Sequence, residues 1–265
     1  MAQPTASRNP EVQKHYAAQF ALSAALAAAL RRLWPVLRPE DVPGTLPAYK
    51  QGVTAMVDQF GTTSSKLAAD HFAAMREQAG ILTPFRAPLA DVMPAEKVQA
   101  SLGWATSDLT ITGGDAETHM PAADTLTITF DRVEAAAQKL VADSGRNELV
   151  AAIEADRKAR GWARVTRAGA CYFCRMLATR PILAGTLYHT RGSAGANANK
   201  RFTGGGDYKF HDNCHCTVEP VFGPYEPSAQ ARADAQLWQD VTASHSGQAA
   251  INVFRRAVEA QRRAA

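Results

Sequence analysis

All four cysteines of the 265-residue chain fall in two short segments. The first reads Cys171-Tyr-Phe-Cys174, and the second reads Phe210-His-Asp-Asn-Cys-His-Cys216. A Cys-x-x-Cys turn brings two sulfurs to one tetrahedral metal ion, and zinc suits sulfur and imidazole donors. The two chelating segments therefore predict one zinc ion per chain. The second segment offers four donors, which are His211, Cys214, His215 and Cys216.

The order of preference among these donors follows from local geometry. The residues after Cys216 read Thr-Val-Glu-Pro-Val, which predicts an extended backbone. Residues two apart in an extended segment share a face, so Cys214 and Cys216 are expected on one side and His215 on the other. The preferred ligands are Cys171, Cys174, Cys214 and Cys216, His211 is the first replacement, and His215 is the least favoured. A site with four protein ligands is structural, because a catalytic zinc keeps one position open to water.

Two other states of the cysteines stay open at this point. Two disulfides require an oxidising compartment, and the sequence shows no secretory signal. Four independent free thiols are the other alternative, although the clustering in two pairs favours a shared metal.

The composition narrows the class of protein. Hydrophobic residues make up 46% of the chain and charged residues 20%. The sequence has no long uncharged apolar run, so no membrane-spanning helix is predicted. The net charge of +4 permits nucleic acid nearby without predicting a specific nucleic-acid interface. Adjacent arginines occur at 31–32, at the end of the first predicted helix, and near the end of the chain at 255–256 and 262–263, which is no dense basic stripe. There is no Walker loop and no dinucleotide fingerprint.

The hydrophobic periodicity predicts a mainly α protein in which a helical body precedes a small α+β zinc-stapled module and C-terminal helices. The predicted units are a disordered tail over 1–9, a helical domain over 10–160, the zinc-binding module over 161–223 and a C-terminal helical segment over 224–265. The predicted helices of the body cover 10–34, 47–78, 94–104, 124–142 and 144–158, with a turn at 41–44. His71 is expected to be partly exposed or hydrogen-bonded.

The module at 161–223 is predicted to hold three short strands, at 162–167, 182–189 and 217–222, with a helical turn or two at 175–179. A glycine-rich loop is expected at 191–206, where it offers sites for proteolysis. A segment of this kind buries little apolar surface, so a metal is expected to offset its chain entropy.

The cysteine motifs carry a family resemblance. The stretch Ala170-Cys-Tyr-Phe-Cys-Arg-Met-Leu-Ala178, followed by Phe210-His-Asp-Asn-Cys-His-Cys-Thr-Val218, resembles minor capsid or head-morphogenesis proteins of tailed phages. The similarity is to the Mu F-like family, and in particular to its actinobacteriophage branch. The resemblance covers roughly the last 100 residues. It implies metal ligands at five positions, which are Cys171, Cys174, His211, Cys214 and Cys216.

The resemblance also implies a function. It predicts a structural, non-enzymatic minor capsid protein that is made in the host cytoplasm and carried in the virion, in the capsid interior or at the portal vertex. Its expected partners are the portal protein or the major capsid protein, with DNA near but not bound specifically. The alternative is a zinc-knuckle (HNH-like) nuclease, for which His211, Asp212, Asn213 and His215 are suitable residue types.

Overall fold

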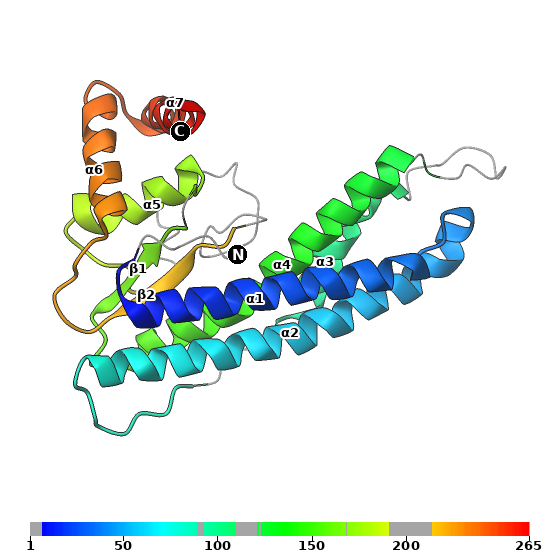
Figure 1. Ribbon diagram of the computed structural model, residues 1–265, viewed down its shortest axis with the longest axis horizontal. Coiled ribbons are helices and arrows are strands. Elements are labelled where there is room, and N and C mark those ends of the chain that lie inside the picture. Colours follow the sequence, from blue (N-terminus) through cyan, green and yellow to red (C-terminus); the bar gives the residue numbers. More distant parts are fainter. Residues whose placement is uncertain are drawn as a thin grey trace.

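The computed structural model describes residues 7–88, 93–109, 121, 123–167, 169–190 and 214–264. The described chain is mainly helical with one small sheet, which confirms the predicted fold class (Figure 1). Three long helices form an elongated body: α1 (Pro10–Leu33), α2 (Val42–Gln78) and α4 (Ala123–Ala155), with the short α3 (Ala95–Ala105) beside α4. The sheet and the last three helices gather at one end of this body.

The first two helices begin where polar side chains cap them. Asn9 accepts a hydrogen bond from the backbone N–H of Glu11 at 2.9 Å, and Asp41 accepts one from Gly44 at 3.0 Å. Because Asp41 is a cap, α2 begins at Val42, and the predicted turn at 41–44 is in fact its first turn. No described helix is by itself long and apolar enough to cross a membrane, although the bent pair Pro10–Val36 and Pro39–Gln78 passes that test jointly by length and composition.

The two helices predicted at 124–142 and 144–158 are one continuous helix, α4. The small residues at the expected break are instead a close contact between helices. A Cβ atom added to Gly145 would lie 2.5 Å from Ser64 Oγ and 2.9 Å from the Ser64 carbonyl oxygen. Gln19 of α1 joins this crossing, since it donates to the Ser64 carbonyl at 3.1 Å and accepts from its hydroxyl at 2.9 Å. Serine and glycine here permit close packing rather than ending a helix.

The core of the body lies between α1, α2, α3 and α4. Trp34, just after α1, packs between α2 and α4. The centroid of its ring lies 5.3 Å from that of Tyr49 in α2 and 5.0 Å from that of Phe130 in α4, and both pairs meet edge-on. Aliphatic side chains fill the space behind these rings, including Leu26, Leu30, Val53, Val98, Leu102 and Leu140. Burial of this amphipathic face is the main stabilising contribution to helices of this kind.

The sheet has two strands among the described residues, β1 (Gly161–Val165) and β2 (Thr217–Val221). They pair antiparallel, with Gly161 opposite Val221 and Val165 opposite Thr217. The prediction of a third strand at 182–189 is wrong. α5 (Tyr172–Leu183) extends into that segment, and only a single bridge between Trp162 and Tyr188 follows it.

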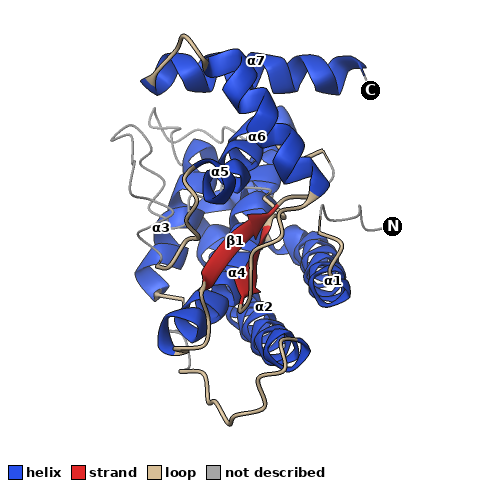
Figure 2. Ribbon diagram, turned by 90° about the vertical axis from the view of Figure 1, so that its left-hand side faces the viewer, coloured by secondary structure: helices blue, strands red, loops and turns tan. Residues whose placement is uncertain are grey.

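α5 packs with α6 (Ala229–Thr242) and α7 (Gly247–Ala264) as a separate group of helices, seen above the sheet in Figure 2. Ser228 caps α6 as predicted, since its hydroxyl accepts from the backbone N–H of Ala231 at 3.1 Å. Met176, Leu177, Phe254 and Val258 form the buried centre of this group.

The sheet also packs directly on the helical body. Trp162 of β1 and Val218 of β2 share one buried cluster with Phe72 of α2 and Leu149 and Ile153 of α4. The cluster continues into the cysteines of the two chelating segments. The predicted division at residue 161 therefore marks a change from helix to strand, while the apolar core crosses it.

Candidate metal centre

Three buried cysteines meet where the sheet, α5 and α4 come together. The sulfur atoms of Cys174, Cys214 and Cys216 lie within 4.8 Å of one another, and those of Cys174 and Cys214 are 3.4 Å apart. All four cysteines of the chain are free thiols. Tetrahedral zinc with Zn–S bonds of about 2.3 Å holds its sulfurs about 3.8 Å apart. The spacing and the soft donor set therefore fit a zinc ion.

Cys171 adjoins this trio through Cys174. It is the N-cap residue of α5, with an extended backbone (φ −66°, ψ 159°), and its side chain hydrogen-bonds the Cys174 thiol. Cys171 and Cys174 therefore both lie at the N-terminus of α5. The structure thus brings three of the five predicted ligands within 4.8 Å of one another, Cys174, Cys214 and Cys216, while Cys171 lies beside this group and not within it. The fifth predicted ligand, His211, lies outside the described residues, as do the loop at 191–206 and the residues Asp212 and Asn213.

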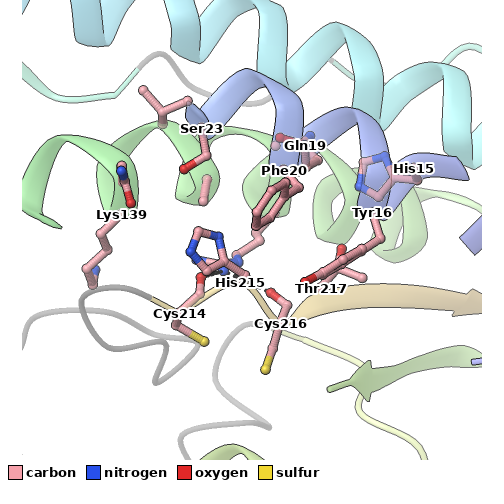
Figure 3. A pocket seen from close by; sticks show the side chains of 15 residues that line it. His15, Tyr16, Gln19, Phe20, Ser23, Lys139, Cys214, His215, Cys216 and Thr217 are labelled. Atoms are coloured by element: carbon pink, nitrogen blue, oxygen red, sulfur yellow. Dashed lines mark hydrogen bonds between the residues drawn. The ribbon is translucent and has the colours of Figure 1, made fainter. Parts of the chain in front are cut away.

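The backbone from Cys214 to Cys216 alternates as predicted. Figure 3 shows both sulfurs on one side of the chain and the ring of His215 on the other. That ring packs against Phe20 of α1, with centroids 5.6 Å apart. Burial lowers the pKa of His215, and the charge of Arg167 adds to this effect. His215 is therefore a packing residue that faces away from the sulfurs.

Arg146 of α4 holds the backbone of the second cysteine segment. Its Nη2 atom donates to the carbonyl oxygens of Cys214 at 2.6 Å and Cys216 at 2.8 Å, and its Nη1 atom donates to Asp143 at 2.8 Å. The guanidinium and the carboxylate are both buried. The role of Arg146 could not be predicted from the sequence, because its carbonyl partners lie about seventy positions away along the chain. The one local indication was the i, i+3 spacing of Asp143 and Arg146, which allows an ion pair on one helix face.

Arg164 of β1 is a second buried cation at the cluster. Its side chain is almost fully enclosed and its Nη1 atom lies 3.6 Å from the Cys174 sulfur. Burial lowers the pKa of Arg164, but Cys174, Cys214 and Cys216 raise it, and the net direction is upward. The sequence signal that could have predicted a buried Arg164 is the alternation of β1, because residues two apart share a face and Arg164 therefore lies on the same face as Trp162.

The thiols are not equivalent. Hydrogen bonds from Cys174 and Cys216 lower the pKa of Cys214, and the charges of Arg146 and Arg164 act in the same direction against the effect of burial. The pKa of Cys174 is raised, first by its hydrogen bond with Cys171. Cys214 is thus the thiol best prepared to be a thiolate, with the other two as donors to it.

His71 is a correction to the sequence analysis. It is neither exposed nor hydrogen-bonded: its side chain is buried, and neither ring nitrogen has a hydrogen-bond partner among the described residues. Its ring instead stacks on that of His15. The reason is tertiary, since α1 lies along α2 and covers this face of the helix.

Comparison with known proteins adds a family. Residues 6–244 match the family model described as VG15 protein, which covers most of the chain. The chain belongs to the VG15 protein family. VG15 is a family of phage proteins, so the predicted phage origin is confirmed at this level. No curated protein and no solved structure matches the chain.

The VG15 match takes in both parts of the molecule just described. It spans the helical body, the sheet and all four cysteines, and it ends at residue 244, between α6 and α7. The body and the cysteine cluster therefore belong to one family unit, in agreement with the apolar cluster that joins them.

Proposed function

We propose that the protein is a structural minor capsid component of a tailed phage, which associates with the portal or the inner capsid surface during head morphogenesis and carries one structural zinc ion. Membership in the VG15 family of phage proteins supports the virion role. The observation that carries the zinc site is the buried cluster of three sulfurs with Cys171 beside it. The narrower assignment to the Mu F-like family of minor capsid proteins is also part of this proposal.

The zinc ion would be held by Cys171, Cys174, Cys214 and Cys216, with His211 as the replacement. It would join three elements that are distant in the sequence: the N-terminus of α5, the start of β2 and, through the carbonyl bonds of Arg146, helix α4. A metal that links separate elements contributes its binding free energy to folding. A structural role for this ion is supported by burial, because Cys174, Cys214 and Cys216 belong to a buried apolar cluster.

Metal analysis tests the zinc ion. The full-length protein, purified without added chelator, is expected to hold one zinc ion per chain, and Cys214→Ser is expected to lose it. Because the imidazole of His215 faces Phe20, His215→Ala serves as a matched control and is expected to keep the zinc. Zinc-free protein with four fully reactive thiols would contradict the proposal.

The partner is proposed to bind at the end of the body farthest from the sheet. Three large apolar side chains are exposed there: Val36 after α1, Trp104 in α3 and Ile128 near the start of α4. Contiguous apolar patches mark interaction sites, whereas single exposed apolar side chains are ordinary, so the proposal requires these three side chains to act as one surface. Co-expression with the portal protein of the same phage is expected to give a complex on gel filtration. That complex is expected to survive moderate salt, because apolar burial is not screened.

We further propose that the protein does not act on DNA as a nuclease. In the proposed zinc site the cysteines would fill all four metal positions, and His215 packs on Phe20 on the side of the chain away from the sulfurs. Plasmid DNA incubated with the protein and Mg²⁺ or Mn²⁺ is expected to stay intact. Nicking that is abolished by His211→Ala and His215→Ala, at an unchanged zinc content, would establish the nuclease instead.

A further inference from the structure

Arg164 places a positive charge where water does not reach. Its side chain is 2% exposed, and β1 carries it into the interior between the sheet and α5. Transferring an ion from water to the protein interior is strongly unfavourable unless an opposite charge lies near. An arginine remains protonated under all ordinary conditions, so it cannot relieve this cost by losing its proton. A stable fold with Arg164 in this place therefore needs negative charge beside it.

Among the residues that the structure describes, cysteine sulfurs lie beside Arg164 and can carry negative charge. Its Nη1 atom is 3.6 Å from the sulfur of Cys174, and electrostatic attraction reaches it from Cys174, Cys214 and Cys216. Sulfur supplies such charge only as a thiolate. Four thiolates around a divalent cation leave a net double negative charge, whereas protonated thiols and disulfides are neutral.

The second buried arginine beside the cysteines, Arg146, is held differently. Arg146 already has a carboxylate partner, since its Nη1 atom donates to Asp143 at 2.8 Å, and its Nη2 atom is used by two carbonyl oxygens. Asp143 also receives the ammonium group of Lys139 at 2.7 Å. Arg146 thus has a carboxylate partner within α4, although it shares Asp143 with Lys139 and also acts on Cys214, whereas Arg164 contacts a cysteine sulfur directly.

We infer that Arg164 is the counter-cation of the cysteine centre, a positioning residue that makes the site favour a divalent metal held by thiolates over neutral thiols or a disulfide. The inference rests on the proposed zinc site and adds the residue that determines its charge state. It also explains why a charged residue occupies position 164, since formation of β1 does not by itself require one there. Arg164 would touch the ligand sulfur and not the metal.

The test compares three variants of the full-length protein. Arg164→Met removes the charge at similar length, Arg164→Lys keeps the charge but loses the planar guanidinium, and Arg160→Met removes an exposed arginine just before the same strand. Zinc affinity is measured by competition with a chromophoric chelator at one pH. Arg164→Met is expected to weaken zinc binding about 10–100-fold, the range typical of lost partners of metal ligands. Arg164→Lys is expected to lose less, and Arg160→Met is expected to match the wild type.

A second measurement separates this role from ordinary packing. Urea unfolding is followed with zinc and with excess chelator. With zinc, Arg164→Met is expected to unfold at lower urea than the wild type, because the thiolates have lost their counter-charge. Without zinc it is expected to unfold at equal or higher urea, because replacing a buried ion with an apolar side chain of similar volume is often neutral or stabilising.

The outcomes are distinguishable. Wild-type protein that binds no zinc would overturn the proposed metal site together with this inference. Wild-type protein that binds zinc while Arg164→Met binds it equally well would overturn the inference alone. Equal loss of affinity in Arg164→Met and Arg164→Lys would also overturn it, since charge would not be the cause, and so would destabilisation of Arg164→Met by the same amount with and without zinc.

Discussion

The rings of His15 on α1 and His71 on α2 lie face to face, with centroids 4.4 Å apart and planes only 10° from parallel. Both side chains are buried between the two helices. Burial lowers the pKa of His15 to about 4, against a smaller opposite effect of its hydrogen bond with the backbone of Leu67. Burial, followed by the proximity of His15, lowers the pKa of His71 to about 3. The pair is therefore neutral in the folded protein near neutral pH.

This pair predicts a loss of stability in mild acid. In the unfolded chain each histidine takes up a proton as the pH falls below about 6.5, while the folded pair stays neutral until about pH 4 or lower. The contribution of the pair to stability is thus complete above pH 6.5 and falls between pH 6.5 and 4. The expected slope is up to about 1.4 kcal/mol per pH unit for each histidine. Urea unfolding at several pH values measures it.

The histidine origin of this slope is tested by substitution. His71→Leu is expected to remove about half of the difference between pH 6.5 and 4.5, because one of two titrating groups is gone. His245→Gln is the matched control, since His245 is exposed in the turn before α7. A slope in His71→Leu that equals the wild-type slope would show that acid acts elsewhere, for example by displacing the metal.

Gly145→Ala is expected to destabilise the body although alanine is the better helix former. The new Cβ atom would lie 2.9 Å from a backbone oxygen of α2, which must then move away. Overpacking of this kind costs about 1–3 kcal/mol, and the gain in helix propensity returns up to about 1 kcal/mol of it. Gly103→Ala in α3 is the control, because nothing lies within 4 Å of its added Cβ atom, and it is expected to be stabilising. Equal stabilisation by both substitutions would contradict the close contact between α2 and α4.

Substitution with Co²⁺ is expected to identify the fourth ligand of the metal centre. Sulfur-to-cobalt charge-transfer absorption scales with the number of thiolates, and tetrahedral Co²⁺ has intense visible bands. Because Cys171 touches Cys174, Cys171→Ser is expected to weaken the charge-transfer band and the zinc affinity, and His211→Ala is expected to leave both unchanged. The reverse pattern would give His211 the fourth position.

Trp104→Asp is expected to weaken portal binding at least tenfold without changing the zinc content or the unfolding midpoint. The indole is 55% exposed, so a carboxylate at this position costs the fold little but places a charge in the proposed apolar interface. Leu82→Asp is the matched control, because Leu82 is 82% exposed and follows α2, away from the proposed interface. Pull-down of the portal protein by each variant measures the effect. Equal binding by wild type and Trp104→Asp would move the interface elsewhere.

Local signals in the sequence were sufficient for the helical class, the caps at Asn9 and Ser228, and the two chelating segments. Each of these depends on residues within a few positions of one another, where periodicity and side-chain capping act directly. The alternation that separates Cys214 and Cys216 from His215 is of the same kind, and the structure confirms it.

Contacts between distant segments decided the rest. Gly145 and its neighbours look like a helix break in isolation, and only Ser64 and Gln19 across the interface make them a packing site. His71 is buried because α1 covers it, and Arg164 joins the cysteine cluster because β1 brings it to sulfurs that belong to other segments. The sequence by itself determined which atoms can bind a metal; the tertiary structure decided which buried charges surround it, because burial and electrostatic pairing depend on what the rest of the chain places nearby.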